Sequence, residues 1–203
     1  MKQDRVGVTI ITPAFCRVAG LKRAIESVDA QTYQDWQHLI VHDGPAPLDL
    51  YEMVIGHSDT RRKLIELGQD TLVSGLCQMK GNGPALAGWL FAAHPIVTYC
   101  MDDDYLYEDH VSVLLALLSQ PAVDVAYSSR DHFDNGVFSG RYGHFPPLPG
   151  GIGLCDVMHR LTFVRESGWH LGSVRNDWDM FETWLKLGKR FAFSPKATHA
   201  FCH

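Results

Sequence analysis

The sequence predicts an α/β fold in which a doubly wound, mostly parallel sheet is flanked by helices. Three observations support this prediction. Short apolar runs alternate with segments whose apolar residues recur at helical spacing, which is the pattern of βαβ units. The strand-like runs are nearly continuous in apolar residues, as expected for strands covered on both faces. Pro and Gly stand after several of these runs and mark their ends.

In the first half of the chain, strands and helices are expected to alternate. The run RVGVTIIT over 5–12 is β-branched and predicts a buried strand that Pro13 ends. Leu21, Ala24 and Ile25 recur at helical spacing and predict a helix over 18–30. The stretch 69–80 has no clear period. The remaining expected elements are a strand over 38–42, a helix over 48–56, a strand over 63–67, a helix over 85–93 and a strand over 95–101.

After residue 130 the character of the chain changes. The segment 131–154 is rich in Gly, Pro and aromatic residues, and it predicts a hairpin followed by a loop at the rim of a site. Pro195 is expected to break the last strand. The other expected elements of this half are a helix over 108–119, a strand over 123–129, an extended segment over 156–163, a helix over 176–187 and a strand over 190–194.

Composition excludes several classes of protein. The chain has 203 residues, 46% of them apolar, which suits one globular domain with a sizeable core. Its net charge of −5 argues against a nucleic-acid partner. We expect no transmembrane segment and no signal peptide, because no apolar run is long enough and the first residues lack that layout. Five scattered cysteines without a CxxC pair suggest a cytoplasmic location, and peripheral attachment to a membrane stays open.

Three consecutive carboxylates, Asp102, Asp103 and Asp104, follow the apolar run 95–101. Like charges this close cannot all stay ionised without a cation or strong hydrogen-bond donors. One interpretation is a divalent cation held by oxygen ligands beside a phosphorylated substrate. The other is a solvated acidic turn before the helix that begins near Glu108.

Several segments together resemble the family 2 glycosyltransferases, which have the GT-A fold. They are VTIITPAFCR with LKRAIESVDAQTYQDWQHLIVHDG, then YCMDDDYLYEDHV, NDWDMFETWLKLGKRFAFSP and PKATHAFCH. The resemblance spans nearly the whole chain in the family's order. It implies a single GT-A domain over 1–203, a Rossmann-like nucleotide-binding half over 1–104 and an acceptor-binding half over 105–203 with a small antiparallel element.

The resemblance also implies an activity. A sugar would pass from a nucleotide-diphosphate donor to a hydroxyl of a glycan or other acceptor, as in hexosyltransferases, and the transfer would invert the anomeric carbon. Asp43 would accept hydrogen bonds from the base or ribose, although it could also be a turn residue before Gly-Pro. Phe15 would stack on the base or, equally, pack in the core. The expected nucleotide-binding residues are Thr12, Pro13, Phe15, Arg17, Asp43, Lys80 and Asp102.

The family's metal-binding D-x-D region can be aligned here in two registers. Counting back from Glu108 makes Asp103 the principal ligand, whereas a literal D-x-D makes Asp102 and Asp104 the pair. We place Asp103 and Asp104 near the metal and Asp102 near the nucleotide. His199 lies in a His-Ala-Phe that resembles a metal-binding motif of related transferases, although it could be a surface histidine. Mn²⁺ and Mg²⁺ both suit carboxylate and phosphate oxygens, and a histidine ligand would favour Mn²⁺.

Asp177 resembles the catalytic base of inverting members of the family. A carboxylate there would take the proton of the acceptor hydroxyl as its oxygen attacks. Both Asp177 and Asp179 could instead stabilise the first turn of a helix through its dipole. Asp156, His159 and Trp178 are candidates for the acceptor side. His159 could equally be a core or strand-end histidine, and a tryptophan such as Trp178 is more often a core residue.

Two alternatives stay open beside this resemblance, and departures from the family pattern support the first. Ala14, Cys16 and Asn176 replace more usual residues, so the chain could be a catalytically impaired nucleotide-sugar binding protein. A nucleotidyltransferase also couples an α/β sheet to acidic metal ligands. That class predicts a Gly-rich loop after the first strand, and residues 13–17 are not Gly-rich. The helix after Gly83 lacks the Arg-Asn of many members, so a phosphate or sugar contact would either be lost or be supplied by Lys80 or Arg17.

Overall fold

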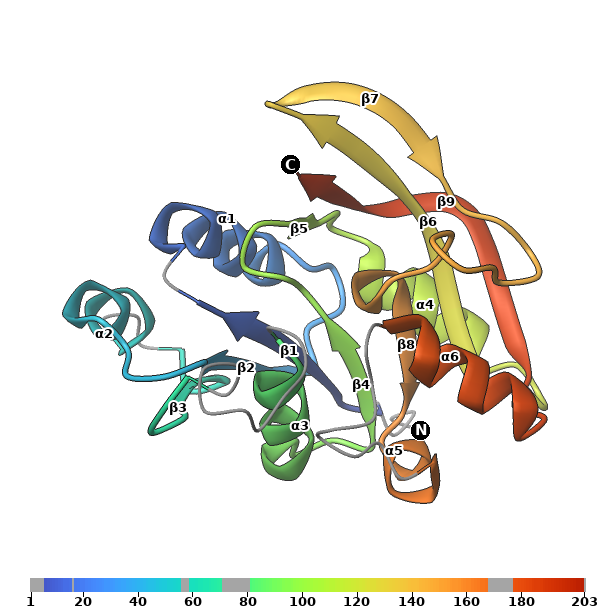
Figure 1. Ribbon diagram of the computed structural model, residues 1–203, viewed down its shortest axis with the longest axis horizontal. Helices are drawn as coiled ribbons and strands as arrows, with labels where there is room; N and C mark the ends of the chain where they lie inside the picture. The colour runs from blue at the N-terminus through green and yellow to red at the C-terminus, as the bar shows by residue number, and fades with distance from the viewer. Residues whose placement is uncertain (1–5, 16, 56–58, 71–80, 168–176, 203) are drawn as a thin grey trace.

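The computed structural model describes residues 6–15, 17–55, 59–70, 81–167 and 177–202 (Figure 1). Within these residues one mixed sheet forms, in the order β3-β2-β1-β4-β8-β6-β9-β5, with β7 paired to β6. Its strands are β1 Val8–Ala14, β2 Trp36–His42, β3 Arg62–Glu66, β4 Ile96–Tyr99, β5 Tyr105–Leu106, β6 Val125–Asp134, β7 Val137–Tyr142, β8 Val157–Arg160 and β9 Phe191–Cys202.

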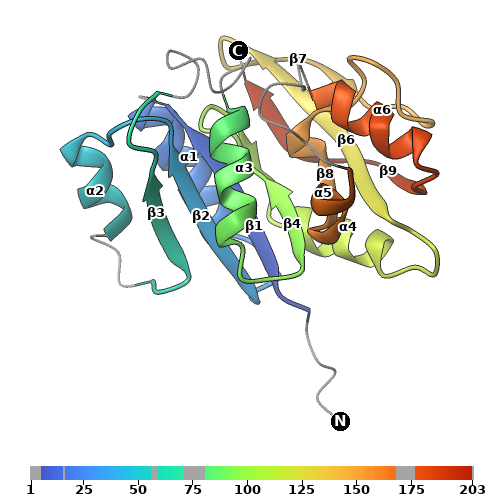
Figure 2. The same cartoon turned by 60° about the horizontal axis from the view of Figure 1, so that its bottom comes forward.

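Helices cover both faces of the sheet, as the sequence predicts. They are α1 Val18–Asp29, α2 Leu48–Ile55, α3 Asn82–Phe91, α4 His110–Leu118, α5 Thr162–Ser167 and α6 Asp177–Lys186. Figure 2 shows α3, α5 and α6 on the near face, where Trp89, Phe163 and Trp184 share one core cluster. On the other face α1 and α4 bury Ala24 and Leu114 in a second cluster.

The first half of the sheet is parallel and the second half is mixed. β3, β2, β1 and β4 run parallel, which places their carboxyl ends at one edge. β8 then pairs antiparallel with both β4 and β6, and β9 pairs parallel with β6. The sheet therefore joins a Rossmann-like half to a C-terminal half of different topology.

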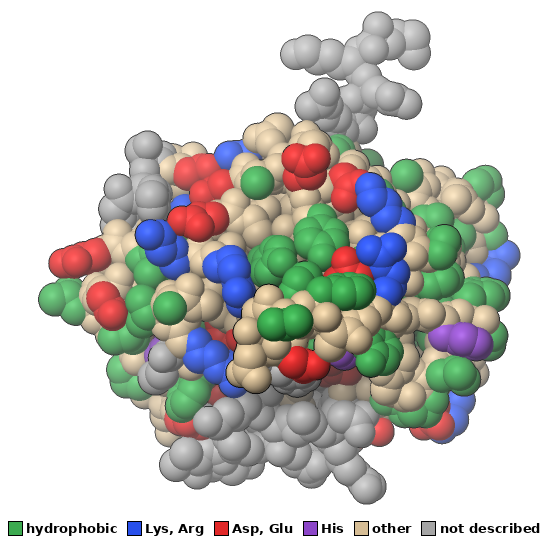
Figure 3. Space-filling model, turned by 90° about the horizontal axis from the view of Figure 1, so that it is seen from above, with side chains coloured by type: hydrophobic (Ala, Val, Ile, Leu, Met, Phe, Trp, Pro, Cys, Tyr) green, Lys and Arg blue, Asp and Glu red, His purple; other side chains and the backbone are tan. Residues whose placement is uncertain are grey.

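The expected hairpin is present as β6 and β7. β7 lies at the top of Figure 1, and three of its side chains are exposed hydrophobic residues, Val137, Phe138 and Tyr142. The face seen from above shows hydrophobic side chains gathered among charged ones (Figure 3). The short helix α5 and the strand β5 were not expected from the sequence.

Two expectations about proline were wrong. Pro13 does not end the first strand, because β1 continues to Ala14 and pairs there with β2. Beyond Ile11, β1 has no partner in β4, so the missing N–H of Pro13 interrupts no ladder on that side. Pro195 does not break β9, because the β6–β9 register shifts from Ser128↔Ser194 to Ser129↔Ala197. This bulge takes up the two residues between them, and a bulge is one of the few places in a sheet where proline is tolerated.

The other expected elements lie close to their observed positions. α6 begins at Asp177, and Asn176 lies outside the described residues. Lys80, Cys16 and most of the ambiguous stretch 69–80 also lie outside them. In the part of the chain that the structure describes, none of the helices is long and apolar enough to cross a membrane.

Candidate active site

The candidate donor residues gather at the carboxyl edge of the parallel strands. β1 ends at Ala14 and β2 at His42, and the Asp43 N–H donates to the Ala14 carbonyl at 2.9 Å. The ring of Phe15 stacks on His42, with 6.4 Å between the ring centroids and 15° between the planes. In open α/β sheets this edge is where ligands bind.

Not all of the expected nucleotide-binding side chains reach this edge. Thr12 is fully buried, and its Oγ1 is hydrogen-bonded to His38 Nε2 at 2.8 Å. Asp43 is also buried, whereas Phe15 is partly exposed. Pro13 lies within β1. Among the described donor candidates, the accessible side chains are therefore those of Phe15 and Arg17.

Asp102 and Asp103 face this edge and share one arginine. Asp102 Oδ2 accepts a hydrogen bond from the Phe15 N–H at 2.8 Å, and its Oδ1 lies 3.3 Å from Arg17 Nη1. Arg17 also pairs with Asp103. Burial raises the pKa of Asp102, and the Phe15 N–H and Arg17 oppose that shift. Two of the three consecutive charges are thus offset by a backbone N–H and a guanidinium.

Asp104 turns away from the other two carboxylates. Its Oδ1 accepts a hydrogen bond from the Cys202 N–H at 2.9 Å, which ties the acidic segment to the end of β9. Burial raises its pKa to about 7, even though the Cys202 N–H acts in the opposite direction. Asp104 is 1% exposed and lines a pocket that neither Asp102 nor Asp103 lines.

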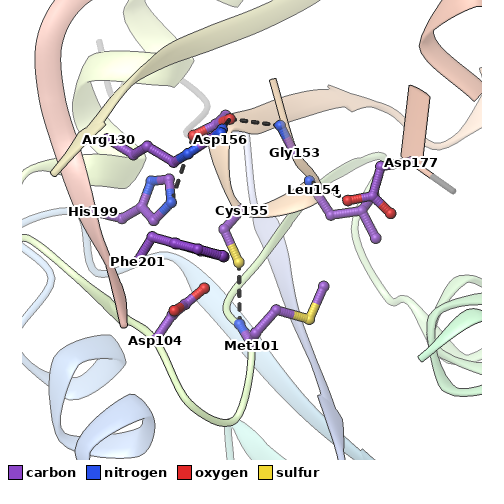
Figure 4. Close-up of a pocket in the computed structure, with 10 residues that line it drawn as sticks. All are labelled: Met101, Asp104, Arg130, Gly153, Leu154, Cys155, Asp156, Asp177, His199 and Phe201. Carbon is purple, nitrogen blue, oxygen red and sulfur yellow. Dashed lines mark hydrogen bonds and ion pairs between the residues drawn. The ribbon is translucent and has the colours of Figure 1, made fainter. Parts of the chain in front are cut away.

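This pocket, of about 110 Å³, collects polar side chains from distant parts of the chain (Figure 4). Met101, Leu154 and Phe201 contribute apolar walls. The ionisable and thiol side chains that line it are Asp104, Arg130, Cys155, Asp156, Asp177 and His199. The pocket thus contains three carboxylates, one guanidinium and one imidazole. Such a cluster of ionisable side chains in a pocket is typical of sites that transfer protons.

Asp177 is held at the pocket by the backbone. Its Oδ2 accepts a hydrogen bond from the Leu154 N–H at 3.0 Å. Burial raises its pKa, and the Leu154 N–H and the charge of Arg130 oppose that shift. A partly desolvated carboxylate of this kind can accept a proton near neutral pH.

Asp156 and His199 form a buried pair beside it. Asp156 Oδ2 accepts hydrogen bonds from the Gly153 N–H at 2.6 Å and from Arg130. His199 Nε2 lies 3.5 Å from Asp156 Oδ1, yet Asp156 Oδ1 and His199 Nδ1 are both buried without a hydrogen-bond partner. Burial raises the pKa of Asp156 to about 7 and lowers that of His199 well below its ordinary value.

Two acceptor-side candidates lie away from the pocket. His159 is fully buried, is hydrogen-bonded to the Tyr99 hydroxyl at 2.8 Å and packs 4.7 Å from the ring of Trp184. Trp178 is partly buried against the core cluster that contains Trp184. Both placements agree with the core alternative that the sequence left open.

The expected metal ligands do not form a single group. Among the described residues, no three His, Cys, Asp or Glu side chains are arranged to hold a metal ion. Asp103 pairs with Arg17 and lies outside the pocket, whereas Asp104 and His199 both line it. Because the Nδ1 of His199 is buried without a partner, Asp104 and His199 are the pair whose chemistry fits an ion with its remaining ligands on a substrate.

Sequence reasoning missed Arg130 and Phe201. Arg130 follows the predicted strand 123–129, and its place in the pocket depends on a pairing with Asp156 that no local pattern of residues signals. Phe201 is separated from His199 by one residue of β9, so both project from the same face of that strand.

Comparison with solved structures reveals the same fold in another protein. S. aureus TarS 1–349 in complex with UDP matches with a TM-score of 0.77 and 12% identity, covering 97% of this chain and 60% of that chain. TarS 1–349 in complex with UDP-GlcNAc also has a TM-score of 0.77, with 13% identity, 97% of this chain and 58% of that chain covered. This chain thus spans less than two thirds of the TarS chains it matches. The expected GT-A fold is confirmed.

Comparison by sequence gives the family. A search of curated proteins found no match to this chain. The model of glycosyl transferase family 2 matches residues 9–181, which is most of the chain and includes both the donor edge and Asp177. This protein therefore belongs to glycosyl transferase family 2 and is a glycosyltransferase.

Proposed function

We propose that this glycosyltransferase moves a sugar from a uridine-diphosphate donor to a hydroxyl acceptor, with inversion at the anomeric carbon. The observation that carries the proposal is the position of Asp177 in a pocket next to the donor edge. The acidic segment 102–104 joins these two places, because Asp102 faces the edge and Asp104 lines the pocket. The choice of uridine rests on the TarS complexes with UDP and UDP-GlcNAc.

Asp177 is assigned the role of general base. As the acceptor oxygen attacks the anomeric carbon, its proton passes to a carboxylate oxygen of Asp177, and the nucleoside diphosphate leaves from the opposite face of the sugar. The Leu154 N–H fixes the orientation of the carboxylate. A well-placed base of this kind contributes about 10²–10⁴-fold to the rate. Asp156, which is buried in the same pocket, is assigned to the acceptor side.

The donor nucleotide is assigned to the edge near Phe15, Asp43 and Asp102. Phe15 offers a ring for stacking, and Arg17 is an exposed positive charge that could turn to the diphosphate. Its side chain is 59% exposed, so releasing Asp102 and Asp103 costs little.

A divalent cation, Mn²⁺ or Mg²⁺, is assigned to Asp104 and His199. Asp104 and His199 would hold the ion, and it would supply Lewis-acid stabilisation of the charge that develops on the departing diphosphate. Mixed oxygen and nitrogen ligands favour Mn²⁺.

The test is calorimetry with UDP, GDP, CDP and TDP, each with and without Mn²⁺, followed by turnover of UDP-GlcNAc. We expect UDP to bind, and Mn²⁺ to strengthen its binding in the wild type but not in Asp104→Asn. Asp177→Asn should lower turnover about 10²–10⁴-fold while UDP binding stays within twofold. Asp179→Asn, in the same first turn of α6, is the matched control and should keep near-normal turnover.

A binding protein without catalysis is the second candidate. It is favoured by the pairing of Arg17 with Asp102 and Asp103, since those carboxylates are already neutralised. UDP binding without turnover of any UDP-sugar, on folded wild-type protein, would support this candidate. No nucleotide binding at all would contradict both.

A further inference from the structure

Arg130 makes contacts that go beyond neutralising one charge. It lies in β6 where that strand passes the pocket, and its side chain is only 11% exposed. Nε donates to His132 Nε2 at 2.8 Å, Nη2 donates to the Gly150 carbonyl at 2.9 Å, and Nη1 donates to Asp156. Each of its three nitrogens is therefore engaged by the protein itself.

The turn at Gly153 and Leu154 binds two carboxylates through consecutive backbone N–H groups. The Gly153 N–H donates to Asp156 at 2.6 Å and the Leu154 N–H donates to Asp177 at 3.0 Å. A Cβ placed on Gly153 would lie 3.7 Å from Asp177 Oδ2 and 3.8 Å from both Arg130 Nη1 and Asp156 Oδ2. Three charged groups from β6, η1 (Leu154–Asp156) and α6 thus converge around one glycine.

From this geometry we infer that Arg130 is a positioning residue that holds the 150–156 turn and, through it, the carboxylates of Asp156 and Asp177 in their working orientation. The inference rests on the proposed function of Asp177. Arg130 fixes the turn at two points, the Gly150 carbonyl and Asp156, and the N–H groups that bind the carboxylates lie between those points.

Arg130 also supplies the positive charge that lets two carboxylates stay close. Like charges in one buried site repel, and the guanidinium of Arg130, which pairs with Asp156 and acts electrostatically on Asp177, reduces that cost. Among the described residues, the charged and titratable groups near Asp177 include Arg130 from β6, Asp156 from η1 and Tyr99 from β4. Among the described side chains that line the pocket, Arg130 is the one guanidinium.

These contacts separate Arg130 from a donor-binding arginine. Because its three nitrogens already donate to protein acceptors, Arg130 should not contribute to UDP affinity. Its loss should lower the rate of the chemical step and leave nucleotide binding unchanged. A role limited to stability would lower the folded fraction and affect both measurements alike.

The experiment compares wild type, Arg130→Ala, Arg130→Lys and the control Arg141→Ala. The control removes an exposed arginine of the same hairpin, which pairs with Asp131. UDP affinity is measured by calorimetry and turnover of UDP-GlcNAc by release of UDP. We expect Arg130→Ala to lose about 10²-fold in turnover with UDP affinity within twofold. Millimolar guanidinium should restore Arg130→Ala at least tenfold and leave Arg141→Ala unchanged.

Arg130→Lys keeps the charge and tests the geometry if Arg130→Ala does not fold. One ammonium cannot reach all three acceptors, so turnover should fall about tenfold with UDP affinity retained. Wild-type turnover in either variant, or a parallel loss of UDP affinity, would overturn the inference.

A further measurement is independent of turnover. Carboxyl ¹³C NMR follows the titration of Asp177, which is identified by its absence in Asp177→Asn. The pKa of Asp177 should be higher in Arg130→Ala than in the wild type, and an unchanged pKa would overturn the inference. If wild-type protein neither binds UDP nor turns over a UDP-sugar, the proposed function fails, and this titration still decides whether Arg130 acts on Asp177.

Discussion

Two arginines neutralise carboxylates of the candidate site, one at the exposed donor edge and one in the pocket. Arg17 is 59% exposed and pairs with Asp102 and Asp103 at the donor edge. Arg130 is 11% exposed and pairs with Asp156, which is 1% exposed, in the pocket. Ion pairs in water contribute little to stability and rearrange easily, whereas breaking a buried pair leaves a charge that water cannot solvate. The exposed pairs of Arg17 at the donor edge can therefore exchange for a ligand, whereas the buried pair of Arg130 and Asp156 keeps the pocket side chains in fixed positions.

The largest expected effect tests the buried side of this comparison. At pH 8, Arg130→Met should lower the free energy of unfolding by about 3–5 kcal/mol, the range for removal of one partner of a buried pair. Arg17→Met should lower it by less than about 1 kcal/mol. Urea unfolding measures both. Adding Asp156→Asn to Arg130→Met should recover part of the loss, because no buried charge is then left unpaired. Equal losses of unfolding free energy in Arg130→Met and Arg17→Met would contradict the proposed difference between the buried and the exposed pair.

The pH dependence of stability extends the comparison to the buried imidazole of His159. Burial lowers the pKa of His159 to about 4 from its ordinary 6.5, so the unfolded chain binds a proton at higher pH than the folded protein does. The contribution of neutral His159 to the free energy of unfolding is present in full above about pH 6.5. It is lost as the pH falls toward 4, by an amount of the order of 3 kcal/mol. His159→Gln should reduce this loss in urea unfolding at pH 7 and pH 5. His144→Gln, at an exposed histidine, is the control and should behave as the wild type.

The exposed side of the comparison is tested by ligand binding. If Arg17 leaves Asp102 and Asp103 for the diphosphate, Arg17→Gln should weaken UDP binding about tenfold, the effect of one charged hydrogen bond. Calorimetry measures the affinity. Lys22→Gln, an exposed cation on α1, should leave the affinity unchanged. Tighter UDP binding by Arg17→Gln would show instead that Arg17 stays with its carboxylates and blocks the edge.

Salt gives the smallest expected effect. The difference in unfolding free energy between wild type and Arg17→Gln should shrink from at most about 1 kcal/mol at low salt to near zero at 1 M NaCl, where the Debye length is about 3 Å. The difference in unfolding free energy between wild type and Arg130→Lys should be the same at 1 M NaCl as at low salt. Urea titrations at both salt concentrations measure this, and a salt-independent Arg17 difference would mean that this pair is shielded from solvent.

The parallel half of the fold could be predicted because its signals are local. The strand over 38–42 and the helix over 18–30 each carry their own periodicity, and both lie within two residues of β2 and α1 at each end. The strand ends at Pro13 and Pro195 could not be predicted, because they depend on which neighbours pair across the sheet. A proline ends a strand only where its missing N–H would have made a ladder bond.

The candidate site could also be predicted only in part, because local signals mark its acidic residues but not the partners that orient them. Asp102, Asp103 and Asp104 stand out in the sequence, but their different directions depend on partners 85 or more residues away, Phe15, Arg17 and Cys202. Arg130 gives no local signal, because its role comes from a pairing with Asp156 across 26 residues. Pairings of this kind depend on the tertiary fold, which no local pattern of residues encodes.

The hydrogen bond from the Cys202 N–H to Asp104 links the last strand to the acidic segment. An amide proton exchanges with deuterium only when its hydrogen bond opens, so the exchange rate at Cys202 measures how often Asp104 is released. A ligand that draws Asp104 away would speed exchange at this amide, and one that locks β9 against β5 would slow it. Deuterium uptake at one position in the backbone would thus report on occupancy of the site without any enzymatic assay.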